Sequence, residues 1–400
     1  NDGKPVMRAP GHEEIELALV KLHQATGEQL YLEMAQKFLD IRGVTYSPQG
    51  EGVQTSDYAQ QHQPVRDQRE AVGHSVRAMY LYSGMADVVS MMGDTTLLPA
   101  LNSIWHDIVD RKMHINGGLG AVPGIEGFGP AYDLPNLNTY DETCAAVGNV
   151  FFNYRMFLMS GEAKYVDVAE VALYNNVLAG VNLEGNKFFY VNVLEADGKR
   201  PFNHGTAGRA PWFGTACCPS NMARLIPQIS GMTYSHTNDD IYTVFYAGNS
   251  TSIPLEGGEV ALKQQTNYPF EEQIAFSFSF PDKKKKSAEF PLDLRIPEWS
   301  NGYTLTVNDA EVKAEDVRRG TIRLNRTWAD GDKVVITFNA AVRISRWYDY
   351  SAVVERGPLV YALRMEEKWQ KHICEGDDVK QLGEYYYEVT STTPWNVALM

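Results

Sequence analysis

Three of the four cysteines fall in two short segments, and their types and spacing could hold a metal ion. Cys144 lies in YDETCAAVGNV with Glu142 just before it, and the adjacent pair Cys217 and Cys218 lies in GTACCPSN. Three thiolates and one carboxylate are enough for a closed tetrahedral zinc site. Soft sulfur ligands favour zinc over the oxygen-seeking metals, and adjacent cysteines rarely close an unstrained disulfide on each other. A disulfide, or buried cysteines that merely fill the core, are the alternatives.

A second candidate lies in a long segment rich in glycine and proline, NGGLGAVPGIEGFGPAYDLP, at residues 116–135. Loops of this length in a compact domain are usually functional or disordered. Glu126 is its only glutamate and has apolar neighbours, so we expect a raised pKa that keeps it protonated as a general acid. The competing interpretation is a solvated loop carboxylate. Glu142 and Cys144 follow at a predicted helix start, which stabilises anions and favours the functional interpretation.

Three histidines precede predicted helices: His12 in APGHEEIELALV, His62 in QQHQPVRDQ and His74 in AVGHSVRAMYLY. Each alone is more often a capping or core histidine than a functional one. His12 and His74 share a Gly-His step before an amphipathic helix, and inner-helix ends of a helical toroid meet around one pocket, so we predict a substrate-binding pair. Tyr190, in FFYVNVL, could stack on a sugar ring, although such aromatic residues more often belong to the core.

The first half of the chain, from about residue 11 to about residue 235, must supply helices that position these residues, because apolar residues recur there at helical spacing. Segments around Gly27, Gly93 and Gly161 each predict a helix ended by glycine, a tight turn and a new helix. These hairpins return at a steady interval, which predicts a helical toroid with an α/α barrel as its closed form. Six helix pairs would need roughly 350 to 400 residues, so we expect the first helices of the barrel to be missing.

The second half changes to short alternating segments, such as IYTVFYAG, IAFSFSF and KVVITFN. They recur about every 8 to 12 residues and are separated by turn signals such as Asp330 with Gly331. This pattern predicts an antiparallel β-sandwich packed behind the helical domain. We therefore expect three regions, namely a helical barrel domain, a β-sandwich, and further strands that begin or return to a second β unit, at residues 1–235, 236–345 and 346–400.

Composition limits the class of partner. The formal net charge of −14 argues against nucleic acid, because phosphate contacts need a basic face. No run of about 18 apolar residues occurs, so we predict no membrane-spanning helix. A small or neutral substrate suits this composition better. Four cysteines in 400 residues also exclude a disulfide-rich scaffold.

The ends of the sequence carry no targeting signal on which to base a compartment. The chain opens at Asn1 and stops at Met400 inside ordinary folded sequence, so we expect it to be truncated at both ends. The periplasm is favoured over the cytoplasm, but the compartment stays open. The sequence also leaves open whether the protein is a monomer or a homo-oligomer.

Taken together, these segments resemble the bacterial β-L-arabinofuranosidases of glycoside hydrolase family 127 and near relatives such as family 146. The resemblance covers nearly the whole chain, in the family's order and approximate spacing. Its specific parts are GHEEIELALVKL, PVRDQ, AVGHSVRAMYLYSGMADV, GIEGFGPAYDLPN, ETCAAVGN, FFYVNVL and TACCPSN. It implies an (α/α)6 barrel that carries the active site, followed by β-sandwich domains.

The resemblance also implies a role for each residue of the cysteine group. A zinc ion would be held by a glutamate and three cysteines, here Glu142, Cys144, Cys217 and Cys218. Cys217, the first cysteine of the adjacent pair, would be the nucleophile as well as a ligand. Glu126 would be the acid/base.

By the same matching, His12 and His74 are similar to sugar-binding residues, and Tyr190 is a third. His62 gains no role. A further sugar-contacting histidine of the family would belong to the part of the barrel that precedes Asn1.

The predicted function is therefore a retaining glycosidase that releases terminal β-L-arabinofuranose from arabinose-containing oligo- or polysaccharides of plant origin. Zinc would keep Cys217 ionised, so that it forms a thioglycosyl intermediate, and Glu126 would act first as acid and then as base. One alternative is an α/α-barrel hydrolase or lyase with a purely structural zinc, in which Glu126 and Asp133 do the chemistry. Another is a non-catalytic carbohydrate-binding or structural protein.

Overall fold

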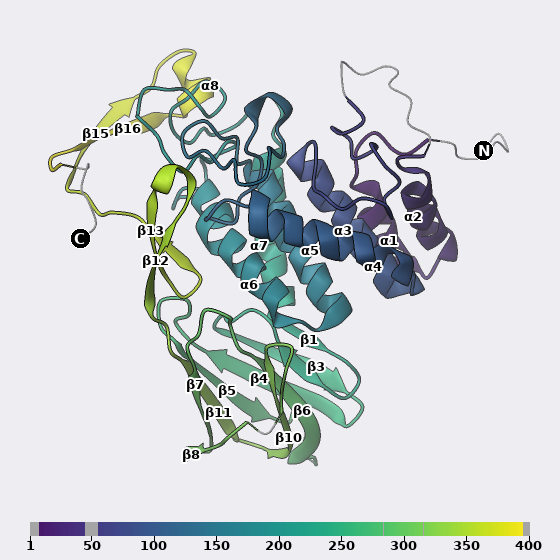
Figure 1. Cartoon of the computed structure of the whole chain (residues 1–400). Coiled ribbons are helices and arrows are strands. Elements are labelled where there is room, and N and C mark those ends of the chain that lie inside the picture. Colours follow the sequence, from purple (N-terminus) through teal and green to yellow (C-terminus); the bar gives the residue numbers. More distant parts are fainter. Residues whose placement is uncertain (1–7, 45–54, 283, 315, 395–400) are drawn as a thin grey trace.

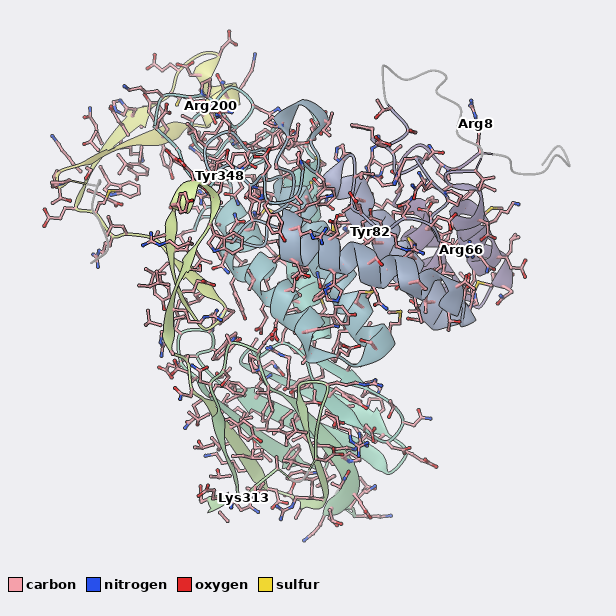
Figure 2. The ribbon with its side chains drawn as sticks, in the orientation of Figure 1. Arg8, Arg66, Tyr82, Arg200, Lys313 and Tyr348 are labelled. Atoms are coloured by element: carbon pink, nitrogen blue, oxygen red, sulfur yellow. The ribbon has the colours of Figure 1, made fainter. Side chains whose placement is uncertain are left out.

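The computed structural model describes residues 8–44, 55–282, 284–314 and 316–394 of the chain (Figure 1). Figure 1 shows helices gathered in one part, a β-sandwich beside them, and hairpins from the C-terminal region running back along both. Side chains fill the space between these ribbons; Tyr82 lies among the helices, and Lys313 lies at the far tip of the sandwich (Figure 2). The fold is thus a helical domain followed by β domains that are mostly antiparallel.

Seven helices make up the described helical part. They are α1 (Ile15–Thr26), α2 (Gln29–Ile41), α3 (Ser75–Met92), α4 (Leu98–Asp107), α5 (Thr143–Ser160), α6 (Ala163–Ala172) and α7 (Cys217–Gln228). Turns of π-helix extend α4 and α6, at Ile108–Lys112 and Leu173–Val177. The first six helices form three consecutive pairs, as the sequence predicts, whereas the closed ring of six pairs stays a prediction.

The three predicted glycines end α1, α3 and α5. Gly27, Gly93 and Gly161 have φ angles of 75°, 71° and 70°, which is the left-handed region that glycine adopts without a steric cost. In each, the backbone N–H closes the last turn of its helix by donating to the carbonyl four residues earlier. A new helix then starts within a few residues, so the hairpins follow directly from the sequence.

Helices α3 and α5 are the centre of this part, because both are buried on nearly every side. They pack so closely that a Cβ added to Gly148 of α5 would lie 2.6 Å from the Cβ of Met79 of α3. A Cβ on Gly84 of α3 would likewise lie 2.8 Å from the Cβ of Glu16 of α1. This close packing brings the N-termini of α3 and α5 to the same end of the domain. No helix within the described ranges is long and apolar enough to cross a membrane.

The β-sandwich consists of two sheets. The five-stranded sheet has the order β1 (Tyr234–His236), β2 (Ile241–Thr243), β6 (Ser287–Arg295), β10 (Thr321–Ala329) and β9 (Val317–Arg318). The six-stranded sheet has the order β3 (Asn249–Leu255), β4 (Gly258–Gln265), β5 (Gln273–Ser279), β11 (Lys333–Phe338), β7 (Tyr303–Val307) and β8 (Ala310–Glu311).

Burial alternates along the strands, as in β5 and β11, so one face of each sheet contributes to a shared core. Trp328 is fully buried there, with ring centroids 4.8 Å from Phe278 and 6.0 Å from Phe290. One pair departs from the predicted antiparallel pattern, because β2 and β6 are parallel. The chain builds β3, β4 and β5 of the other sheet between them, and such a long connection permits parallel neighbours.

The C-terminal region contributes a three-stranded sheet and a hairpin. The sheet comprises β12 (Val342–Arg346), β13 (Ala352–Arg356) and β14 (Leu359–Tyr361), and the hairpin comprises β15 (Glu367–Ile373), α8 (Asp378–Leu382) and β16 (Tyr385–Ser391). This region returns to the helical domain: Asn175 donates to the carbonyl of Pro358 at 2.8 Å and accepts from the N–H of Val360 at 2.8 Å. The domain limits near residues 235 and 345 stay predictions.

A buried ionic cluster fastens the sandwich to α6. The guanidinium of Arg295 is fully buried and lies 2.6 Å from Asp167 and 2.5 Å from Glu170. The hydroxyl of Tyr268 also donates to Glu170, at 2.6 Å. Burial raises the pKa of both carboxyls, and the arginine opposes that rise. The cation of this cluster comes from the sandwich and its carboxylates come from the helical domain, so each domain neutralises buried charge of the other.

Replacing Arg295 with Met should lower the free energy of unfolding by about 3–5 kcal/mol, because two carboxyls would stay buried without their cation. Denaturant unfolding followed by circular dichroism measures this loss. Arg343→Met is the matched control, since Arg343 is exposed beside Glu355 and should cost at most about 1 kcal/mol. Equal losses in the two variants would contradict the role of the cluster.

Candidate active site and metal centre

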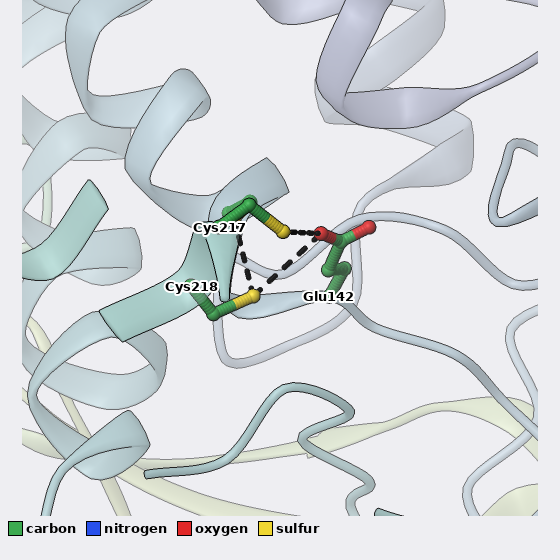
Figure 3. A group of neighbouring side chains, drawn as sticks. Glu142, Cys217 and Cys218 are labelled. Atoms are coloured by element: carbon green, nitrogen blue, oxygen red, sulfur yellow. Dashed lines mark hydrogen bonds between the residues drawn. The ribbon is translucent and has the colours of Figure 1, made fainter. Parts of the chain in front are cut away.

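The starts of α5 and α7 bring the four predicted metal ligands together. Glu142 caps α5 and Cys144 lies in its first turn, while Cys217 and Cys218 begin α7. One ligand atom from each lies within 4.8 Å of all the others. In Figure 3 the Glu142 carboxylate points at the two sulfurs of the adjacent pair, and its Oε1 lies 3.7 Å from the Sγ of Cys217 and 3.6 Å from that of Cys218.

All four cysteines are free. The sulfurs of Cys144 and Cys218 are 3.1 Å apart, well beyond the roughly 2.05 Å of a disulfide bond. A disulfide within the group is therefore wrong for this structure. Cys374, the fourth cysteine, lies in the C-terminal region and belongs to no ligand group among the described residues.

The donor atoms fit a tetrahedral metal ion. An ion about 2.3 Å from sulfur and about 2.0 Å from oxygen would separate the two ligand atoms by about 3.5 Å, close to the two distances between Glu142 and the cysteine pair. Glu142 is 1% exposed, and its Oε2 has no hydrogen-bond partner among the residues that the structure describes. Burial and then the charge of Cys217 raise the pKa of Glu142. A buried, unsatisfied carboxylate beside three sulfurs needs a cation, so this group is positioned to bind a metal.

The three cysteines are not equivalent. Cys144 and Cys218 are buried, and burial raises the pKa of each thiol, whereas Cys217 is only half-buried. The thiols of Cys144 and Cys218 donate to the sulfur of Cys217 and lower its pKa, and the Tyr190 hydroxyl, 3.0 Å away, adds to this effect. Cys217 therefore holds negative charge first and is the most accessible sulfur of the three.

Tyr190 contacts the cysteine group through its hydroxyl. Its ring is buried against His204 and Phe213, with centroids 4.3 Å and 5.5 Å away. Such a ring offers no open face for a sugar, so the structure does not support the predicted stacking. A contact between its hydroxyl and substrate stays a prediction.

Glu126 lies against the start of α3. Its carbonyl accepts hydrogen bonds from the N–H and the hydroxyl of Ser75, both at 3.1 Å. The flanking glycine explains this close approach, because a Cβ on Gly127 would lie only 2.1 Å from the carbonyl oxygen of Gly73. The Gly-rich sequence around Glu126 thus allows the carboxylate to reach the helix start.

Both carboxylate oxygens of Glu126 accept hydrogen bonds. Nε2 of His74 lies 3.0 Å from Oε2, and the Tyr140 hydroxyl donates to Oε1 at 2.9 Å. Since Nδ1 of His74 accepts from the N–H of Val76 at 3.2 Å, the ring proton is on Nε2 and a neutral His74 donates to Glu126. His74 and then Tyr140 lower the pKa of Glu126, against the effect of burial. The predicted raised pKa is wrong, because donors rather than apolar groups face the carboxylate.

Buried polar contacts order the long loop that carries Glu126. Asp141 accepts hydrogen bonds from the amides of Asn116, at 2.9 Å, and of Asn176, at 3.1 Å. A second contact joins the residues that flank the loop: Nε2 of His114 lies 3.1 Å from the hydroxyl of Thr139. These contacts join the two ends of the loop to each other, so the loop that positions Glu126 is held in one conformation.

Three other residues considered in the sequence analysis, namely His12, His62 and Asp133, make no hydrogen bond to Glu126 or to the cysteine group within the described residues. His12 is exposed before α1, but burial of part of its ring, followed by the charge of Arg77, lowers its pKa to about 4. His62 stays without a role. Asp133, the partner of Glu126 in the carboxylate alternative, is exposed to solvent.

The predicted site omitted several residues that hold it together. Asn221 donates to the sulfur of Cys144 at 3.1 Å, and its own oxygen accepts from the hydroxyl of Tyr80 at 2.9 Å. Asn221 stands one helical turn after Cys217 in TACCPSN, so the sequence could have placed it on the same helix face as Cys217. Tyr140 likewise stands in YDETC, two residues before Glu142, whereas His204 has no such signal, because only the folded loops bring it to the site.

The class of this protein is defined by two features. A helical domain precedes β domains that are mostly antiparallel, and a group of cysteines and a glutamate suited to bind a metal lies at the helix starts. Residues 4–231 match the family model for the β-L-arabinofuranosidase GH127 catalytic domain, and residues 240–340 match that for the GH127 middle domain. The chain belongs to glycoside hydrolase family 127.

Individual relatives agree with this family. Over 397 residues the chain is 33% identical to a non-reducing end β-L-arabinofuranosidase of Bifidobacterium longum subsp. longum, and the match covers 92% of this chain and 60% of that protein. The chain therefore spans less than two thirds of this relative.

Two solved structures are also similar. The GH127 β-L-arabinofuranosidase of Geobacillus stearothermophilus T6 has a TM-score of 0.83 at 33% identity, over 100% of this chain and 68% of that chain. A GH127 β-arabinofuranosidase has a TM-score of 0.81 at 36% identity, over 97% of this chain and 66% of that chain.

The purified protein should contain one divalent metal ion per chain, and Cys218→Ser should reduce this content, because a hydroxyl is a poor substitute for a thiolate ligand. Elemental analysis measures the stoichiometry, and chelation should lower the melting temperature of the wild type. Cys374→Ser is the matched control and should keep its metal. Metal content that Cys218→Ser leaves unchanged would contradict the assignment of the group.

The loop should lose stability in acid through His114. Burial lowers its pKa from 6.5 to about 4, so as pH falls the unfolded chain takes up the proton first. Its contribution is complete above pH 6.5 and should fall by about 3 kcal/mol by pH 4. Urea unfolding at several pH values measures this loss. His114→Gln keeps a donor for Thr139 without titrating and should show a shallower pH dependence; equal slopes would contradict the assignment.

Proposed function

We propose that this chain carries the catalytic centre of a retaining glycoside hydrolase that releases terminal β-L-arabinofuranose from plant-type glycans. The observation that carries this proposal is that Cys217 and Glu126 both lie beside Glu142: the Sγ of Cys217 is 3.7 Å from Oε1 of Glu142, and a carboxylate oxygen of Glu126 lies within 4.8 Å of one of Glu142. A tyrosine hydroxyl contacts each of them: that of Tyr190 lies 3.0 Å from the sulfur of Cys217, and that of Tyr140 lies 2.9 Å from the carboxylate of Glu126. The activity of the family and of the similar proteins supports the same conclusion. We further propose that the helices belong to an (α/α)6 barrel.

We propose zinc as the metal, held by Glu142, Cys144, Cys217 and Cys218, because three sulfurs and one carboxylate suit its preferences. When bound, it supplies the positive charge that keeps the three thiols ionised at neutral pH. The ligands carry more negative charge than one divalent ion neutralises, so the sulfur of Cys217 stays electron-rich. The helix start and the Tyr190 hydroxyl stabilise the same thiolate.

The reaction would proceed in two displacements, which together retain the anomeric configuration. In the first, Sγ of Cys217 forms a bond to the anomeric carbon as the glycosidic C–O bond breaks, and Glu126 gives its proton to the leaving oxygen. In the second, Glu126 takes a proton from water, whose oxygen attacks the anomeric carbon and releases the Cys217 thiolate. His74 and Tyr140 would orient the Glu126 carboxyl throughout.

The first displacement needs a protonated Glu126, whereas its two hydrogen-bond donors favour the ionised form. Exclusion of water by a bound sugar would shift this balance, because burial is the largest of the contributions that raise the pKa of Glu126. We therefore expect proton uptake by Glu126 to accompany substrate binding. His12 and His74, at the starts of neighbouring helices, and the hydroxyl of Tyr190 are proposed as sugar contacts.

Cys217→Ser should lower kcat on an aryl β-L-arabinofuranoside by at least about 10³-fold, because a serine hydroxyl is a weak nucleophile at neutral pH. Fold and sugar binding should be kept, as judged by circular dichroism and by titration with L-arabinose. Cys374→Ser is the control and should turn over normally. An aryl β-pyranoside assayed in parallel tests the sugar preference.

Two outcomes separate the competing functions. Turnover retained by Cys217→Ser would contradict the thiolate nucleophile and favour a carboxylate mechanism with a structural metal. Absence of activity on every furanoside and pyranoside in the wild type, with sugar binding kept, would identify a carbohydrate-binding protein instead.

A further inference from the structure

His204 lies between the two tyrosines that hold the predicted catalytic pair. Its Nε2 is 3.4 Å from the hydroxyl of Tyr140, which donates to Glu126. Its ring packs on Tyr190, whose hydroxyl contacts the sulfur of Cys217, with ring centroids 4.3 Å apart. One side chain therefore contacts both of the tyrosines that hold the predicted catalytic pair.

The direction of the hydrogen bonds follows from the number of protons available. The hydroxyl of Tyr140 has one proton, and the Glu126 carboxylate accepts it. Nε2 of His204 must therefore donate to the oxygen of Tyr140, which gives a chain of donors from His204 through Tyr140 to Glu126. Hydrogen bonds in such a chain polarise and strengthen one another.

The backbone of His204 is strained, with φ at 48° in the left-handed region that residues with a side chain rarely adopt. Such conformations cost free energy and persist where the surrounding structure fixes them, which is common at active sites. His204 stands in a tight turn closed by reciprocal backbone hydrogen bonds between Asn203 and Thr206, at 2.9 Å and 3.2 Å. The strain is therefore held in place by its neighbours.

Asn203 ties this turn to the segment that carries Tyr190. It is fully buried, and its Oδ1 accepts from the N–H groups of Tyr190, at 2.8 Å, and Val191, at 3.2 Å. From the other side, the side-chain amide of Gln381 in α8 donates to the carbonyl of Gly205 at 2.8 Å. The turn is thus fixed both from within the helical domain and from the C-terminal hairpin.

We infer that His204 is a positioning residue of the reaction proposed above, on which this inference rests. It holds the hydroxyl of Tyr140 against Glu126 and packs on the ring of Tyr190, whose hydroxyl contacts the sulfur of Cys217, so that the acid/base and the nucleophile keep one mutual orientation. Its hydrogen bond acts on the Glu126 side alone. Loss of that bond should therefore impair proton donation to the leaving group more than attack by sulfur.

His204→Phe tests this inference, because it keeps an aromatic ring against Tyr190 and removes the donor. Kinetics are compared on methyl and 4-nitrophenyl β-L-arabinofuranosides, since the alkyl leaving group needs a proton and the nitrophenyl group hardly does. The inference predicts a fall in kcat of about tenfold on the methyl glycoside, against less than about twofold on the nitrophenyl glycoside, with KM unchanged. His204→Gln, which restores an N–H donor, should recover part of the loss.

Equal losses on the two glycosides, or no loss, would overturn the inference even if the wild type is active. If His204→Phe does not fold, Gln381→Ala replaces it; this variant keeps His204 but loosens its turn, and should show a smaller loss with the same selectivity.

Inactivity of the wild type on both glycosides would instead be a failure of the proposed function. A crystal structure of His204→Phe then decides the inference separately. The inference predicts that the hydroxyl of Tyr140 moves out of hydrogen-bond distance of Glu126, and an unmoved Tyr140 would overturn it.

Discussion

The structure depends on holding four electron-rich groups in one buried space. Glu142, Cys144, Cys217 and Cys218 would repel one another if ionised and would be costly to bury if left unpaired. Two helix starts meet around them and supply partial positive charge, Asn221 donates a hydrogen bond to the sulfur of Cys144, and the hydroxyl of Tyr190 contacts the sulfur of Cys217. A metal ion is the remaining requirement of this arrangement. The close packing of α3 with α5 then sets where Glu126 can lie.

Much of this could be predicted because it is encoded locally. A glycine that ends a helix in the left-handed region signals its hairpin without any knowledge of distant contacts, and Gly27, Gly93 and Gly161 all do so. The alternation of buried and exposed residues likewise predicts the strands of the sandwich. The cysteine group was also evident, because thiolates together with a carboxylate suggest a shared ligand wherever the helices place them.

The parts that sequence could not supply depend on contacts between distant segments. The pKa of Glu126 follows its two donors, His74 and Tyr140, rather than its apolar neighbours in the chain. The face of Tyr190 is covered by His204 and Phe213, which no local pattern places against it. The parallel pairing of β2 with β6 depends on the route of the chain through the second sheet, and periodicity within a strand contains no information about that route.

The hydrogen bond from Gln381 to the Gly205 carbonyl makes the support of the His204 turn a composite of regions far apart in sequence. Cutting the chain after α7, where the catalytic family model ends, would remove that bond together with the contacts of Asn175 to the C-terminal region. The unit that positions the proposed catalytic residues is thus larger than the stretch of residues 4–231 that the catalytic family model matches. Anyone who grafts its helices onto another scaffold must also bring the C-terminal hairpin.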